Sequence, residues 1–171
     1  MTTTLEKNGI RFLYPETWSL TEFGDAEEFQ EISLESPEGS IWSVSVFSGD
    51  ASAEQVIQSC LEALKDQYDD LESFEFSGDY NGFDATGFDA DFYCLDFLVT
   101  AQTRTLNYGG KIYSFFCQAE SREFEKNKDV FNALTLSLLK NEIEWFDFQQ
   151  FEFSASVICK KYNRRDSDSG C

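Results

Sequence analysis

Hydrophobic and polar residues alternate along several short segments in the first third of the chain, a pattern typical of strands with one buried face. Gly9–Tyr14 and Trp18–Phe23 flank the turn sequence Pro15-Glu-Thr17, so they predict a hairpin that opens the fold. Glu28–Glu35 and Ile41–Phe47 alternate in the same way around a Pro-Glu-Gly turn. They predict an antiparallel pair with one solvent-facing side.

The next segment changes from strand to helix periodicity. Ser52 and Gln55 have the spacing of a capping box, in which each side chain binds a backbone N–H of the other residue. The apolar residues that follow recur every three or four positions, with acids on the other side, and predict a helix from about 52 to 70. These residues are Ala53, Val56, Ile57, Cys60, Leu61, Leu64 and Tyr68.

Strand-like alternation returns in the middle of the chain. Leu71–Phe76, Phe83–Asp91 and Phe92–Leu106 predict strands, and Asn107-Tyr-Gly-Gly110 predicts a turn into a partner strand at Lys111–Ala119. Together these segments predict a meandering antiparallel sheet.

Ser121 begins a second helical pattern that runs to about Ala133, and Leu134–Leu139 fits either a continuation of this helix or a returning strand. The residues that it buries are Phe124, Val130, Phe131 and Leu134. Runs of strands interrupted by two helices predict an α+β fold, a central antiparallel sheet flanked by helices.

A chain of 171 residues fits one domain. We expect a single α+β domain over 1–158 and a disordered tail over 159–171. Large apolar residues are dense between Ile143 and Phe153, which predicts an amphipathic segment that packs on the domain or forms an interface. These residues are Ile143, Trp145, Phe146, Phe148, Phe151 and Phe153.

Charge restricts the partners. With 32 acidic and 13 basic residues the formal net charge is −19, so nucleic acid is disfavoured and a basic protein is attracted, although solubility also explains an acidic surface. No apolar run is long enough to span a bilayer, and the first residues lack the pattern of a secretory signal. We therefore expect a cytoplasmic protein without membrane insertion.

Catalytic patterns are missing from the sequence. The chain has no histidine, which excludes Ser-His-Asp and Cys-His arrangements, and it contains neither a P-loop nor a dinucleotide-binding glycine pattern. Its five cysteines form no C-x-x-C pair, so we expect buried reduced thiols, with the thiol of Cys171 as the exception that could react. We predict no catalytic residues, no metal and no cofactor.

One repeat could carry a carboxylate site. Gly-Phe-Asp-Ala occurs twice, at 82–85 and 87–90, and supplies Asp84 and Asp89 next to Asp91. The odd spacing places Asp84 and Asp89 on opposite faces of a regular strand, and they converge only if Gly87 marks a bulge. Asp84, Asp89, Asp91, Trp145, Phe146 and Phe148 are our candidate partner-binding residues.

One segment of this acidic sequence contains no acidic residues. No Asp or Glu occurs between Phe97 and Ala119, where Arg104 and Lys111 lie. Such a hairpin is either a central strand pair covered on both faces or a contact face. The apolar run Phe97-Leu-Val99 favours the buried alternative.

Three features resemble a known group: the opening Phe12-Leu-Tyr-Pro-Glu-Thr-Trp18, an early strand pair followed by the helix that starts at Ser52, and a late hairpin followed by a helix into Leu134–Leu139. Over roughly residues 8–140 the chain is similar to the PsbP-like α/β/α sandwich superfamily. This superfamily includes a photosystem extrinsic subunit, the Ran guanine-nucleotide release factor and Eag-type secretion chaperones.

The resemblance implies a sheet flanked by helices in a protein that binds other proteins, and it supplies no catalytic residues. The leading hypothesis is a non-enzymatic cytoplasmic adaptor with an acidic surface that binds a protein partner. Two alternatives remain: a secretion-type chaperone that shields apolar helices of a client, and a carboxylate-based metal-binding protein or hydrolase.

Overall fold

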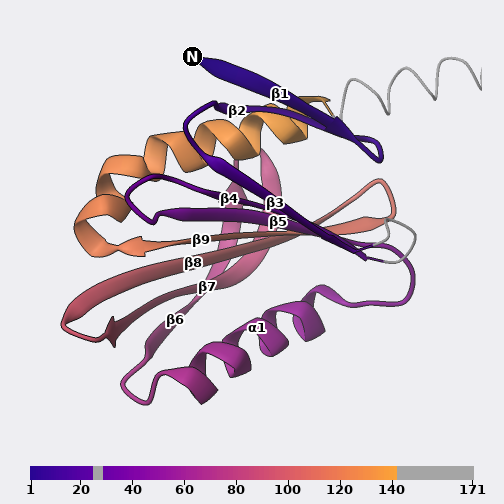
Figure 1. Cartoon of the computed structure of the whole chain (residues 1–171). Helices are drawn as coiled ribbons and strands as arrows, with labels where there is room; N and C mark the ends of the chain where they lie inside the picture. The colour runs from indigo at the N-terminus through magenta and orange to yellow at the C-terminus, as the bar shows by residue number, and fades with distance from the viewer. Residues whose placement is uncertain (25–28, 142–171) are drawn as a thin grey trace, which may run out of the picture.

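The computed structural model describes residues 1–24 and 29–141. In this part of the chain, seven strands form one antiparallel sheet in the order β3-β4-β5-β9-β8-β7-β6, and β1 and β2 form a separate hairpin. One helix packs on each face of the large sheet, as Figure 1 shows. The predicted α+β fold, with a central antiparallel sheet flanked by helices, is confirmed.

The elements follow the chain in a simple order. The strands are β1 (Thr2–Lys7), β2 (Ile10–Pro15), β3 (Ser19–Gly24), β4 (Phe29–Glu35), β5 (Ile41–Phe47), β6 (Glu72–Tyr80), β7 (Phe83–Cys94), β8 (Phe97–Tyr108) and β9 (Lys111–Glu120). The helix α1 spans Ala53–Gln67, and a second helix covers 121–141 in the described residues.

The larger core lies under the second helix. This helix, orange in Figure 1, shares its face of the sheet with the β1–β2 hairpin. Strand alternation places Trp42 and Val44 of β5 on this face, where both are fully buried together with Phe12 of the hairpin. Phe131 and Leu138 fill the same core from the helix.

The ambiguity over Leu134–Leu139 is resolved in favour of the helix. Leu134, Leu138 and Leu139 are all buried on the sheet because they continue the apolar stripe that Phe131 begins. On the same stripe, Thr135 accepts a hydrogen bond of 3.1 Å from the indole N–H of Trp42. This bond satisfies the polar atom of the largest core residue.

The smaller core lies under α1. The predicted capping box is present: Ser52 Oγ accepts from the N–H of Gln55, and the Gln55 side chain accepts from the N–H of Ser52. Leu64 packs against Phe88 and Phe92 of β7. Since α1 contacts β7, β8 and β9, it packs mainly on this half of the face.

The predicted opening hairpin is wrong. β2 pairs with β1, whereas β3 pairs with β4 in the large sheet. The turn that joins β1 to β2 is Asn8-Gly9, in which both residues have positive φ, 52° and 81°. Asn-Gly is the strongest two-residue hairpin signal in a sequence, so β1 was detectable.

The predicted strand Phe92–Leu106 is also wrong in its boundaries. β7 continues to Cys94, the chain turns at Leu95 and Asp96, and β8 begins at Phe97. Asp96 is a common turn residue but Leu95 is not, and the apolar residues on both sides of this pair make the turn hard to recognise in the sequence.

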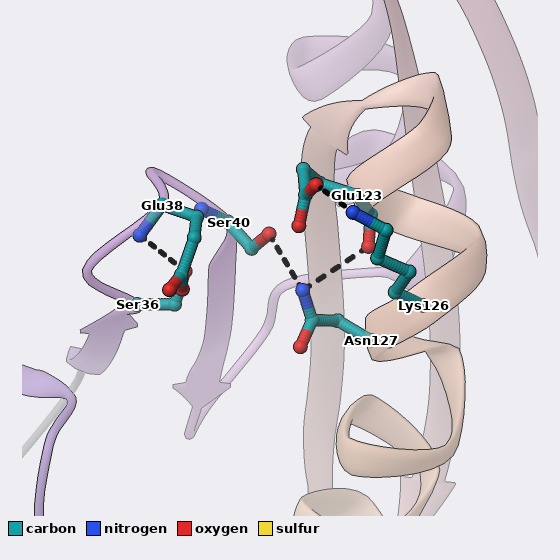
Figure 2. Close-up of polar contacts among 6 residues, drawn as sticks. All are labelled: Ser36, Glu38, Ser40, Glu123, Lys126 and Asn127. Carbon is teal, nitrogen blue, oxygen red and sulfur yellow. Dashed lines mark hydrogen bonds and ion pairs between the residues drawn. The ribbon is translucent and has the colours of Figure 1, made fainter.

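A polar contact fixes the second helix to the β4–β5 turn, as Figure 2 shows. Asn127 donates hydrogen bonds of 3.1 Å to Ser40 Oγ and to the carbonyl oxygen of Glu123. Within the turn, Ser36 Oγ accepts from the backbone N–H groups of Glu38 and Ser40. Because Ser36 and Ser40 are buried and their hydroxyls serve the turn and the helix, we assign them a structural role.

The buried phenol of Tyr80 makes the stability of the fold depend on pH in the alkaline range. Burial raises the pKa of Tyr80 to about 12, and nearby Cys117 adds to the effect. The folded state therefore holds the phenol proton more tightly than the unfolded state, and this contribution is complete below pH 10 and is lost as the pH rises towards 12. When the pH is raised from 9 to 11.5, we expect the free energy of unfolding of Tyr80→Phe to fall by about 2 kcal/mol less than that of the wild type. Urea unfolding at both pH values measures this, and parallel losses would contradict it.

Candidate partner-binding surface

The acid-free hairpin Phe97–Ala119 forms β8 and β9, which lie in the middle of the seven-stranded sheet. Val99 and Ala101 are buried on one face of β8, and Arg104 and Leu106 are buried on the other. The prediction of a central pair covered on both faces is confirmed for the body of the hairpin. The acids are missing here because both faces are covered.

The end of β8 that joins β7 is different, because its apolar side chains are exposed. Tyr93, Leu95, Phe97 and Leu98 are 57%, 89%, 62% and 39% exposed. Tyr93 and Leu98 lie opposite each other on one face of the two strands, Phe97 lies opposite Cys94 on the other face, and Leu95 lies in the turn between them. We call these four residues the hairpin tip. The run Phe97-Leu-Val99 that favoured burial is thus buried only at Val99.

The backbone at the hairpin tip is strained at Leu95. Its φ is +55°, in the left-handed region that glycine and asparagine prefer. A leucine in this conformation costs on the order of 1 kcal/mol, and at 89% exposure its side chain recovers almost nothing by burial. Folding therefore gives no reason for a leucine at this position.

Two acidic residues lie beside the hairpin tip. Asp96 shares its turn with Leu95, and Asp70 accepts a hydrogen bond of 3.1 Å from the backbone N–H of Tyr93. At the base of the tip, Ser121 donates to the carbonyl oxygen of Leu98 at 3.1 Å and so ties the second helix to β8. The hairpin tip is therefore an apolar turn that hydrogen bonds from Ser121 and to Asp70 hold in place, with negative charge beside it. It is the β7–β8 turn, at the left in Figure 1.

The repeated aspartates do not converge. Gly87 pairs with Phe76 and Arg104 in an unbroken register, so β7 has no bulge there. Asp84 therefore lies on the α1 side of β7, and Asp89 and Asp91 lie on the other side. In the described residues, no three His, Cys, Asp or Glu side chains are close enough together to hold a metal ion.

Asp89 and Asp91 bind neighbouring strands of their own sheet. Asp89 Oδ1 accepts from Arg104 Nη2 at 2.7 Å and from the amide of Gln102 at 3.1 Å. Asp91 accepts from the hydroxyl of Thr100 at 2.7 Å. These contacts give both carboxylates a structural use, while a role of Asp84, Asp89 and Asp91 in partner binding stays a prediction.

Sequence reasoning missed the environment of Arg104. Its side chain is only 6% exposed, it donates to the carbonyl oxygens of Phe88 and Thr103, and its guanidinium carbon lies 3.6 Å from the centre of the Phe76 ring. Phe76, Gly87 and Arg104 form one row across three strands. An arginine in an acid-free stretch was visible in the sequence, but its partners become known only with the register.

The other candidates fall into two groups. Trp145, Phe146 and Phe148, with the segment Ile143–Phe153 and the tail, lie outside the described residues, so their role stays a prediction. Among the described cysteines, Cys60, Cys94 and Cys117 form no disulfide. Cys117 is buried, and burial raises the pKa of its thiol, which makes it unreactive.

A scan against protein-family models and a search of curated proteins both found no match. Among solved structures, the chain is similar to cyanobacterial PsbP (CyanoP) from Synechocystis sp. PCC 6803, with a TM-score of 0.52 and 15% identity over 80% of this chain and 89% of that one. The fold is therefore that of the PsbP-like proteins, as the sequence resemblance predicted. At this identity the likeness shows the fold alone.

Two further solved structures are less similar. LpqN of Mycobacterium tuberculosis, described as involved in cell envelope biogenesis, has a TM-score of 0.47 and 17% identity over 78% of this chain and 87% of that one. PA94 of Pseudomonas aeruginosa, described as a putative regulator of unknown function, has a TM-score of 0.48 and 11% identity over 80% and 95%. Neither of the helices in the described residues is long and apolar enough to cross a membrane.

Proposed function

We propose that this chain is a non-enzymatic, cytoplasmic protein-binding domain that docks through the hairpin tip. The exposed apolar side chains of Tyr93, Leu95, Phe97 and Leu98 carry the proposal. Exposed large apolar side chains gathered at one turn of a strongly acidic protein are typical of an interaction site, and such side chains are the anchors that fill pockets on a partner.

Charge indicates the kind of partner. The acids Asp70 and Asp96 beside the tip and the net charge of −19 favour a protein whose apolar pocket has a basic rim. The unpaired thiols of Cys60, Cys94 and Cys117 suit a reducing compartment, which supports the cytoplasmic location. The PsbP-like fold supports a binding role by analogy only.

The test compares pulldowns with two variants of the chain. Leu95→Gly/Phe97→Ser removes two tip side chains, and glycine suits the positive φ at position 95, so we expect the variant to fold. Leu13→Ser is the control, because Leu13 is 48% exposed on β2, away from the tip. We expect the partner to be recovered by wild type and control, and about tenfold less by the tip variant, since loss of the anchors costs more than 1.4 kcal/mol.

Two salt concentrations complete the design. Moderate salt should reduce recovery by wild type and control together, because it screens the acidic surface without removing the apolar contact. Equal recovery with the tip variant, or no enriched protein at either salt concentration, contradicts the proposal.

A further inference from the structure

A groove lies on the side of the sheet that α1 only partly covers. It separates α1 from β4, β5 and β9 and has a volume of about 560 Å³. This volume falls within the range of about 300–1,000 Å³ that is typical of small-molecule sites. The groove is independent of the hairpin tip, because Tyr93, Leu95, Phe97 and Leu98 do not line it.

Small side chains on the sheet create the groove. Ser43 and Ser45 of β5 and Ser114 of β9 form its floor, where larger residues would fill the space below α1. Val56 and Leu64 of α1 form an apolar wall above this floor. The body of the groove therefore suits an apolar chain or ring.

One part of the groove has the chemistry of a cation site. Phe29 and Phe47 pair across β4 and β5 with ring centres 5.1 Å apart, and Glu31 is the next residue on the same face of β4. The Glu31 carboxylate is half-buried and accepts from Ser45 Oγ at 3.2 Å. Two aromatic rings beside a carboxylate form the arrangement that attracts an ammonium group.

The remaining lining residues strengthen this preference. No lysine or arginine is among the described residues that line the groove, so the Glu31 charge has no cationic partner there. Cys60 lies in the same groove, where burial raises the pKa of its thiol and the Glu31 charge raises it further. The local field disfavours anions, and an anionic ligand would find no donor of full positive charge.

We propose that this groove binds a small amphiphile whose ammonium head lies between Glu31, Phe29 and Phe47 and whose apolar body lies along α1. Decyltrimethylammonium is a suitable probe, with decanesulfonate as the anionic counterpart of equal chain length. Titration calorimetry on the full-length chain measures affinity. The rate at which an alkylating reagent modifies Cys60, followed by peptide-resolved mass spectrometry, shows whether the probe occupies the groove.

Because the whole protein is acidic, the variants must separate the groove from general attraction of cations. Glu31→Gln removes the charge in the groove. Glu35→Gln removes an exposed charge four residues further along β4, on the same face, that does not line the groove. We expect Glu31→Gln to weaken the probe about tenfold and Glu35→Gln less than twofold. The probe should also slow alkylation of Cys60 in wild type.

A second variant tests the apolar body of the site. Ala63 is exposed on α1 at the groove, so Ala63→Phe narrows the groove without disturbing the core, and it should reduce both affinity and protection of Cys60. The proposal is overturned by equal effects of Glu31→Gln and Glu35→Gln, by equal binding of the anionic probe, or by binding that leaves Cys60 alkylation unchanged. Absence of binding to wild type overturns it as well.

Discussion

Replacing Gly87 by alanine is expected to lower the free energy of unfolding by about 3 kcal/mol, although the change adds a single methyl group. A Cβ atom at Gly87 would collide with the carbonyl group of Thr103 and would lie 2.7 Å from its carbonyl carbon. The obstacle is backbone in the middle of the sheet, where β8 pairs with β7 and β9, so it cannot move aside at low cost. Urea unfolding at neutral pH measures the effect.

Gly78→Ala is the matched control. Gly78 is also a strand glycine, on the edge strand β6, and a Cβ there meets only the far end of the Phe76 ring at 3.7 Å, an ordinary contact. Alanine at 78 should leave stability unchanged or raise it slightly, because glycine costs more entropy on folding. A loss at Gly87 no larger than that at Gly78 would show that β7 and β8 separate easily.

Strand and helix patterns were predictable where one face of an element meets the core. Trp42, Val44 and Val46 alternate with serines because the second helix packs on one face of β5, while the other face borders the groove beside α1. The start of α1 followed from Ser52 and Gln55, since the capping box depends only on local contacts. Local chemistry and periodicity were sufficient for these elements.

Pairing was harder to predict because it depends on residues far apart in the chain. The hairpin that Pro15 suggested does not form, and β2 pairs instead through the Asn8-Gly9 turn. Asn8-Gly9 gave a clear signal that was available in the sequence. By contrast, only Asp96 marks the turn at Leu95, because a leucine is not expected in the positive-φ conformation that Leu95 adopts.

The hairpin tip was missed for a physical reason. An apolar run such as Phe97-Leu-Val99 predicts burial on average, and only the position of the strand ends relative to the two helices decides which residues project beyond the core. The groove beside α1 was missed for a similar reason, since Glu31 of β4 and Ser114 of β9 are remote from α1 in sequence. Sites formed between elements require the packing as well as the pattern.

Replacing the aspartate of one Gly-Phe-Asp-Ala repeat is predicted to change the free energy of unfolding much more than replacing the aspartate of the other. Asp89→Asn should lower the free energy of unfolding by about 2 kcal/mol, because it removes the negative charge that pairs with Arg104 Nη2 at 2.7 Å. The side chain of Arg104 is only 6% exposed, so little water can solvate its charge once the Asp89 carboxylate is removed. The half-exposed position of Asp89 keeps the effect below that of a fully buried pair.

Asp84→Asn provides the comparison within the same strand. Asp84 is exposed on the α1 side of β7, and its counterpart on β6 in the register is another acid, Asp79. Removing this charge should change stability by less than about 0.5 kcal/mol, with a gain as the expected sign because like charges face each other. Urea unfolding of both variants at pH 7 measures the difference. Equal effects would mean that the ion pair to Arg104 is absent in solution and that both aspartates serve only as solvated surface, while a large loss at Asp89 alone assigns that carboxylate to the fold.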